Sequence, residues 1–187
     1  MRDPLRQMQA HSATKGLTLP KNERLAVVTE TNFCTRLAYR GAADLMGEAY
    51  GVALPTAPCR FASVDERTAL WLGPDEWLLL APDAARRTLL RALQAALAGK
   101  PASIVDLSHR DCGLALNGPM AAQILNAGCP LDLDLAAFPE GMCTRTLLGK
   151  AEVVLWRSAP GIFRLEIARS FTPYVVALLG EAMHDLA

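Results

Sequence analysis

The sequence predicts an α+β fold made of two similar halves, each with the element order β-α-β-β-β-α, related by a pseudo-twofold axis. Three observations predict it. Strand-like runs outnumber helix-like segments, the same order of segments occurs twice, and glycines coincide when the halves are aligned. At an offset of 77, residues 37–51 align with residues 114–128, and Gly41 falls on Gly118. We therefore expect two sheets, each covered on one side by helices.

The length of 187 residues favours one domain, or at most two small ones. Residues 1–24 contain few large apolar side chains, so we expect a flexible N-terminal arm there. A single duplicated domain would follow over residues 25–187, with halves of about 25–101 and 102–187.

The first half contains five runs with the alternating or β-branched pattern of strands. These runs are 25–30, 33–39, 59–63, 68–72 and 76–81. A short helix is expected over 42–50, ended by Gly51, and a hairpin turn over 73–75.

The clearest helix of the first half begins after Asp83, whose carboxylate can cap the first turn. Its apolar stripe has helical spacing and is formed by Leu89, Leu90, Leu93 and Leu97. Gly99 and Pro101 are typical of the end of such a helix.

The second half repeats this order. Strands are expected over 103–108, 112–117, 143–148, 151–157 and 162–168. Helices are expected over 119–127 and at the C-terminus, where Ser170 or Thr172 can cap and Pro173 fits the first turn. The apolar face of the last helix is predicted to be Phe171, Val175, Leu178, Ala182 and Leu186.

Residues 129–142 form a connection that the first half lacks. Leucines at 131, 133 and 135 alternate there with Asp132 and Asp134, and Phe138 follows. A loop of this length is more often functional or interfacial than filler, so we expect it, with the N-terminal arm, to contact partners. The alternative is that its leucines close the domain's own core.

Composition excludes several classes of protein. Nineteen basic and nineteen acidic residues give zero net charge, without the basic field typical of nucleic-acid binding. The chain has no apolar run that could span a bilayer and no signal peptide, so we expect a cytoplasmic protein. The apolar fraction of 51% favours a chain that works inside an assembly, although compositional bias is an equal alternative.

The segment 104–113 is the most site-like stretch of the sequence. It brings together Asp106, Ser108, His109, Arg110, Asp111 and Cys112. An enzymatic interpretation makes His109 a general base oriented by Asp106 or Asp111. In a strand, however, Asp106 and His109 would point to opposite faces. We therefore favour a polar connection between strands, with Arg110 paired to Asp106 or Asp111.

Other motifs are weak. The five cysteines form no C-x-x-C pair, which favours reduced buried thiols over zinc or disulfides. Histidines at 11, 109 and 184 are scattered, glycine-rich phosphate loops are absent, and the tryptophans at 71, 77 and 156 fit core packing. From the residues we expect no catalytic, cofactor-binding or metal-binding residue in this chain.

Four blocks of sequence, taken in order, resemble the gamma subunit of heterotetrameric sarcosine oxidase. They are LGPDEWLLLAP (72–82), IVDLSHR (104–110), NAGCPLDLDLAAFPEGMCTRTLLGKAEVVLWR (126–157) and ARSFTPY (168–174). The resemblance covers roughly residues 30–186.

This resemblance implies a non-catalytic subunit that assembles with alpha, beta and delta subunits of a bacterial enzyme, with alpha in direct contact. That complex demethylates sarcosine oxidatively to glycine, releases hydrogen peroxide, and passes the one-carbon unit to tetrahydrofolate or releases it as formaldehyde. The resemblance places FAD, FMN, NAD and zinc in the partner subunits. We expect neither membrane nor nucleic-acid partners.

The family is similar in fold to the folate-binding domain of the glycine-cleavage aminomethyltransferase. The Lys-Gly-Cys-Tyr-x-Gly-Gln signature of some relatives is not matched, since the corresponding turn, 139–145, reads PEGMCTR. An alternative function is a folate-binding module or a small folate-dependent transferase, in which Arg110 or Arg145 would hold the glutamate tail. Fold analogy alone is a weak argument for it.

Overall fold

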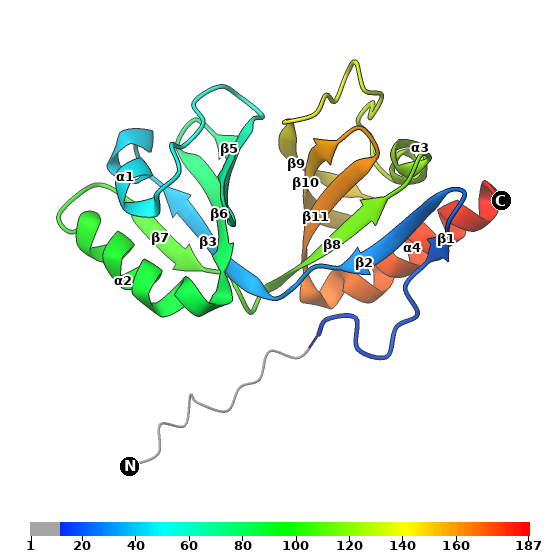
Figure 1. Cartoon of the computed structure of the whole chain (residues 1–187), viewed down its shortest axis with the longest axis horizontal. Coiled ribbons are helices and arrows are strands. Elements are labelled where there is room, and N and C mark those ends of the chain that lie inside the picture. The colour runs from blue at the N-terminus through cyan, green and yellow to red at the C-terminus, as the bar shows by residue number, and fades with distance from the viewer. Residues whose placement is uncertain (1–11) are drawn as a thin grey trace, which may run out of the picture.

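We describe the protein from a computed structural model, in which residues 12–187 are placed. Two antiparallel sheets stand side by side, with helices on their outer sides (Figure 1). The larger sheet has the strand order β1-β2-β8-β11-β10-β9 and the smaller sheet the order β4-β5-β6-β3-β7. The α+β class expected from the sequence is confirmed.

The strands of the six-stranded sheet are β1 (Lys21–Asn22), β2 (Ala26–Glu30), β8 (Asp111–Asn117), β9 (Cys143–Leu148), β10 (Ala151–Ala159) and β11 (Ile162–Ala168). Those of the five-stranded sheet are β3 (Cys34–Arg40), β4 (Phe61–Val64), β5 (Arg67–Gly73), β6 (Glu76–Pro82) and β7 (Ser103–Asp106). The helices are α1 (Gly47–Tyr50), α2 (Arg86–Ala96), α3 (Ala121–Asn126) and α4 (Thr172–Asp185).

The two halves share one arrangement. The order β-α-β-β-β-α is formed by β3 to α2 and again by β8 to α4. The strands β7-β3-β6-β5-β4 of one sheet correspond in position to β2-β8-β11-β10-β9 of the other. β7 lies in the sheet of the first half but leads directly into β8 of the second half. β2 lies in the sheet of the second half but leads directly into β3 of the first half. The halves therefore exchange a strand.

Three apolar clusters form the interior of the described part of the chain, residues 12–187. One lies between α1, α2 and the five-stranded sheet, and includes Leu89 and Leu93. The second lies between α3, α4 and the six-stranded sheet. The third lies between the two sheets, where Trp156 of β10 packs near Leu78 of β6. The layers are therefore helix, sheet, sheet and helix.

Two predicted helix starts are wrong in detail. Asp83 lies inside a short 3-10 turn, where its carboxylate is 3.8 Å from the Arg86 guanidinium rather than capping α2. Phe171 occupies the N-cap position of α4, and the Thr172 hydroxyl instead lies 3.0 Å from the Cys112 sulfur.

The predicted face of the last helix is also wrong in part. Val175 and Ala182 are buried, but Phe171 and Leu186 are exposed. The buried side of α4 is completed by Val176, Leu179 and Met183. The helix is apolar on most of its circumference, so spacing alone does not determine which side faces the sheet.

The predicted arm of residues 1–24 falls partly outside the described residues. Residues 12–24 run along the larger sheet, where β1 pairs with β2 and the Glu30 carboxylate accepts hydrogen bonds from Ser12, Thr14 and the Ala13 amide. The boundary at residue 24 stays a prediction.

Candidate functional site

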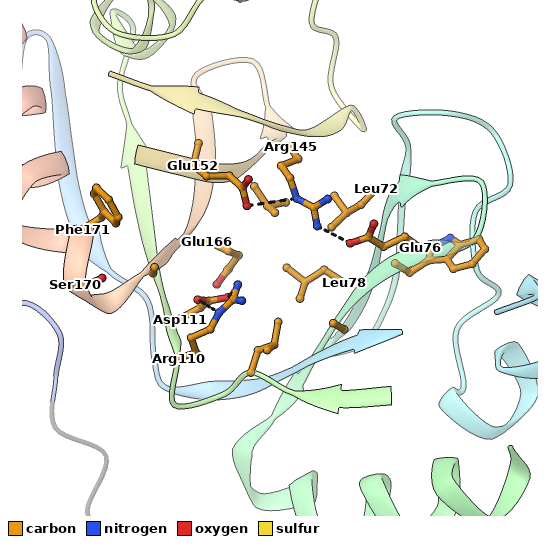
Figure 2. A pocket seen from close by; sticks show the side chains of 16 residues that line it. Leu72, Glu76, Leu78, Arg110, Asp111, Arg145, Glu152, Glu166, Ser170 and Phe171 are labelled. Carbon is orange, nitrogen blue, oxygen red and sulfur yellow. Dashed lines mark hydrogen bonds and ion pairs between the residues drawn. The ribbon is translucent and has the colours of Figure 1, made fainter. Parts of the chain in front are cut away.

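A cavity of about 510 Å³ lies between the two sheets and is lined by side chains from both halves. Figure 2 shows Leu72, Glu76 and Leu78 on the side of the five-stranded sheet, with Arg145 and Glu152 opposite them. Its size is in the range of small-molecule sites. This cavity is therefore the candidate site.

A chain of ion pairs crosses the cavity. Glu76 of β6 accepts a hydrogen bond from Arg145 of β9 at 2.5 Å and another from Arg40 at 2.6 Å. Arg145 also lies 3.7 Å from the Glu152 carboxylate. The Arg145 guanidinium holds the pKa of the Glu76 carboxyl below its usual value. Because Glu76 and Arg145 belong to different halves, these ion pairs connect the two sheets.

Arg110 and Asp111 form a second pair in the cavity. The Arg110 guanidinium donates two hydrogen bonds to the Asp111 carboxylate, at 2.9 and 3.1 Å. The Asp111 side chain is 8% exposed and the Arg110 side chain 64% exposed. The carboxylate of the pair is therefore buried, whereas the arginine side chain reaches solvent. This confirms the pairing of Arg110 with Asp111 as one of the two predicted alternatives.

The deepest charged residue in the cavity is Glu166 of β11, which pairs with Arg36 of β3. Burial raises the pKa of the Glu166 carboxyl, and the Arg36 guanidinium opposes this rise. A Cβ at Gly113 would lie 2.9 Å from Arg36 Nη2 and 3.2 Å from Glu166 Oε1, so glycine leaves room for the pair.

The segment predicted to be site-like is a turn between β7 and β8. Asp106 accepts hydrogen bonds from the Ser108 amide and hydroxyl, and Ser108 Oγ accepts one from the Arg36 amide. His109 lies apart from these, 2.7 Å from Arg86 and against the Phe33 ring. The strand expected over 103–108 ends at Asp106, so the argument from strand alternation does not apply beyond that residue. Its conclusion still holds, because Asp106 and His109 do not come together.

Other expected features are placed as follows. His184 is exposed, and His11 lies outside the described residues. Trp77 and Trp156 are buried, as predicted, and Trp71 is partly buried against the cluster that contains Trp77. Three cysteines are buried, whereas Cys34 and Cys59 are only partly so. Asp132 and Asp134 accept backbone amides of their own loop.

The 129–142 loop differs from the main expectation. Leu133 and Phe138 are buried in the core beneath the six-stranded sheet, although Leu135 is 47% exposed. Arg157 of β10 is buried beneath the loop and donates hydrogen bonds to the Phe138 and Leu133 carbonyls. Much of the loop's apolar side therefore closes the domain's own core, which was the alternative explanation.

Sequence reasoning missed Arg36, Glu166 and Arg157. Each is a charged residue within an apolar strand, and buried charges are rare without a partner. A charged residue in the middle of an otherwise apolar strand is therefore the sequence signal that could have identified them.

Two further properties concern residues 12–187. Their His, Cys, Asp and Glu side chains form no group of three that could hold a metal ion. None of their helices has the length and apolar character that a bilayer crossing requires.

Comparison with known sequences gives consistent matches. A model of the "Sarcosine oxidase, gamma subunit family" matches residues 37–185. The sarcosine oxidase subunit gamma of Corynebacterium sp. strain U-96 is 37% identical over 171 residues, covering 88% of this chain and 82% of the relative. That of Arthrobacter sp. is 33% identical, covering 98% of this chain and 92% of the relative.

Two solved structures are similar to this chain. A chain of heterotetrameric sarcosine oxidase from Corynebacterium sp. U-96 in complex with pyrrole 2-carboxylate superposes with a TM-score of 0.82 and 35% identity, covering 89% of this chain and 88% of that chain. The glycine cleavage system aminomethyltransferase T from Bartonella henselae superposes with a TM-score of 0.66 over 84% of this chain and 46% of that chain. At 16% identity, the second match shows the fold alone. It confirms the expected aminomethyltransferase-like fold.

Proposed function

Because the chain belongs to the sarcosine oxidase gamma subunit family, we propose that it is the gamma subunit of a heterotetrameric sarcosine oxidase. Its role there is assembly and stabilisation, and the chain supplies no catalytic residue. The observation that carries the proposal is the 0.82 TM-score match to a chain of heterotetrameric sarcosine oxidase over nearly the full length of both chains.

The geometry of the cavity supports a structural role. Each charged side chain that lines it is held by an oppositely charged one: Glu76 and Glu152 by Arg145, Asp111 by Arg110, and Glu166 by Arg36. Two of these pairs, Glu76 with Arg145 and Glu166 with Arg36, connect the two halves. A general acid or base must instead reach the proton that it transfers.

The chemistry of the complex would take place in its other subunits. We propose that the alpha, beta and delta subunits carry FAD, FMN, NAD and zinc, and that alpha contacts this chain directly. The complex would oxidise sarcosine with oxygen and water to glycine, formaldehyde and hydrogen peroxide, or transfer the one-carbon unit to tetrahydrofolate.

We also infer that the two halves arose by duplication of one unit. The common element order and the corresponding strand order support this inference. Residues 25–187 would then form one domain, and denaturation should show one transition by fluorescence and by circular dichroism. Two separated transitions would contradict it.

The test of the proposed function is co-expression with the other subunits encoded alongside this chain. We expect the chain to co-purify with them, and we expect omission of the chain to lower the yield of intact complex. Sarcosine-dependent peroxide production by the purified chain alone would overturn the proposal.

Folate binding is a separate test of the alternative function. Both Arg110 and Arg145 line the cavity, but each is engaged by a carboxylate, which a glutamate tail would have to displace. Calorimetric titration of the isolated chain with tetrahydrofolate should therefore give no binding heat. Saturable binding would favour the folate module.

A further inference from the structure

Two cysteines from different halves of the chain lie opposite each other. Arg60 and Met142, which immediately precede β4 and β9, pair as an antiparallel bridge. The bridge is flanked by two backbone hydrogen bonds, one of which runs from the Cys143 amide to the Cys59 carbonyl at 3.0 Å. In this register Cys59 lies directly opposite Cys143, although 84 residues separate them in the sequence.

The backbone spacing of this pair suits a disulfide. Opposed residues of an antiparallel pair that share a hydrogen bond have Cα atoms about 5.5 Å apart. A disulfide requires Cα atoms about 4.4–6.8 Å apart. Cys59 and Cys143 are both free thiols in the structure. Rotation of their side chains, rather than movement of the strands, is therefore what a bond between the two sulfur atoms requires.

The two thiols also influence each other electrostatically. Burial raises the pKa of the Cys143 thiol to about 12, the Trp71 carbonyl opposes this rise, and the Cys59 sulfur adds to it. One sulfur can affect the other in this way only if the two lie near each other. The side chains are therefore neighbours, as the backbone register indicates.

The two sulfur atoms differ in their access to solvent. Cys143 is 0% exposed, whereas Cys59 is only partly buried. Cys59 also has a φ of 57°, a left-handed conformation that is costly for a residue other than glycine and is found at functional sites. A small oxidant from solvent would reach Cys59 first, with Cys143 beside it as the resolving thiol.

We propose that hydrogen peroxide oxidises Cys59 and Cys143 to a disulfide that links the two halves of the chain. The Cys59 thiolate attacks one peroxide oxygen, the O–O bond breaks, and the released hydroxide takes up the proton that Cys59 has lost. The Cys143 sulfur then attacks the sulfenic sulfur of Cys59 and displaces hydroxide, which leaves as water with the Cys143 proton. Two thiols and one peroxide thus give one disulfide and two waters, and the two electrons that the sulfur atoms lose reduce the peroxide.

The oxidant is a product of the complex to which the chain is assigned. A sarcosine oxidase releases hydrogen peroxide at each turnover, so the source of the peroxide rests on the proposed function, whereas the cysteine pair does not. In reducing compartments disulfides are usually transient or redox-sensing. We therefore expect a bond that accumulates during turnover and that dithiothreitol reverses.

The experiment exposes the full chain to hydrogen peroxide, blocks the remaining thiols with N-ethylmaleimide and identifies linked peptides by tandem mass spectrometry without reduction. We expect a peptide that joins residues 59 and 143 in the wild-type chain and its loss in Cys59→Ser and Cys143→Ser. Cys34→Ser is the matched control, because Cys34 is also partly buried but lies opposite Pro82 rather than a cysteine. It should form the linked peptide as wild type does.

Two further readouts follow the chemistry and its effect on the fold. In Cys143→Ser the sulfenic acid of Cys59 has no resolving thiol, so dimedone should trap more of it than in wild type. The oxidised wild-type chain should melt about 5–15 °C above the reduced chain, because the bond closes a long loop in the unfolded state. If Cys143→Ser does not fold, Cys59→Ser, which changes a partly exposed side chain, still tests the link.

The outcomes separate the cysteine pair from the proposed function. Absence of the linked peptide in the peroxide-treated wild-type chain overturns the disulfide, as does equal linkage of Cys59 to another cysteine or linkage that appears only in urea. A bond that forms with added peroxide but not while the assembled complex turns over sarcosine overturns the complex as the source of the oxidant. Failure of the chain to co-purify with the other subunits overturns the proposed function and leaves the cysteine pair intact.

Discussion

The Arg36 guanidinium and the Glu166 carboxylate form an ion pair between the two sheets, with Nε and Oε2 2.5 Å apart and side chains 1% and 4% exposed. Arg36 lies on β3 and Glu166 on β11. At the offset of 77, the position equivalent to Arg36 is Gly113, which lies directly opposite Glu166. The pair therefore lies close to the pseudo-twofold axis. It has room to form because one half has an arginine at this position and the other half has a glycine.

Removing one partner of this pair should be costly. Arg36→Met leaves the Glu166 carboxylate buried without its cation, and we expect the free energy of unfolding to fall by about 3–5 kcal/mol. Urea denaturation of the full chain measures this. The double variant Arg36→Met with Glu166→Leu should be more stable than Arg36→Met alone, because no buried charge remains. A double variant less stable than Arg36→Met would contradict this account.

Arg157 should stabilise the 129–142 loop from beneath. Arg157→Met leaves the Phe138 and Leu133 carbonyls without their donor, at a cost of about 1–3 kcal/mol for each buried group. Arg157→Lys should be intermediate, since lysine can reach one carbonyl. Urea denaturation gives the stability, and limited proteolysis should show earlier cleavage within 129–142. Unchanged protection of the loop in Arg157→Met would contradict the prediction.

Core packing of the loop makes a separate prediction. Leu133→Ser and Phe138→Ser should each lower the stability of the isolated chain by about 3–5 kcal/mol, because both side chains are at most 1% exposed. Thermal melting of the isolated chain measures this. Leu135→Ser is the control, since Leu135 is 47% exposed. Stable Ser variants that fail only in assembly would restore the loop as an interface.

Glu76 should give the chain an acid-sensitive contribution to stability. The Arg145 guanidinium lowers the pKa of this carboxyl in the folded state. A lowered pKa stabilises the fold above the unfolded-state pKa of about 4.3, and this is lost as pH falls through the folded-state value. Glu76→Gln should therefore melt at a lower temperature than wild type at pH 7. The difference should shrink toward pH 3, and a constant difference would argue against the ion pairs.

The cysteines should differ in reactivity. Burial raises the pKa of the Cys34 thiol to about 11 and that of Cys143 to about 12, so few thiolates form there at pH 8. Cys59 is only partly buried, and we expect iodoacetamide to modify it first. Mass spectrometry of peptides after timed labelling tests this, with urea-denatured chain as the control. Equal labelling of Cys59 and Cys143 in the folded chain would be the contrary result.

The strands and turns were largely predictable because their signals are local. The short apolar run over Glu76–Pro82 and the turn at residues 74–75 determine one hairpin without reference to distant residues. The buried face of α4 was not predictable from the sequence, since Leu178 and Leu179 are equally apolar and only packing against the sheet decides which of them is buried. The cavity was harder still, because Glu76 and Arg145 meet only after both halves have folded.

The exchange of β2 and β7 between the sheets has a consequence for synthesis on the ribosome. Val28 of β2 pairs with Leu116 of β8, about 90 residues later in the chain. At about 5–20 residues per second, β2 waits on the order of ten seconds before its partner strand exists. During that interval β2 has only the two-residue β1 to pair with, which makes the nascent chain a candidate for chaperone binding. The five-stranded sheet has no such wait, because all its strands have been translated once β7 is made.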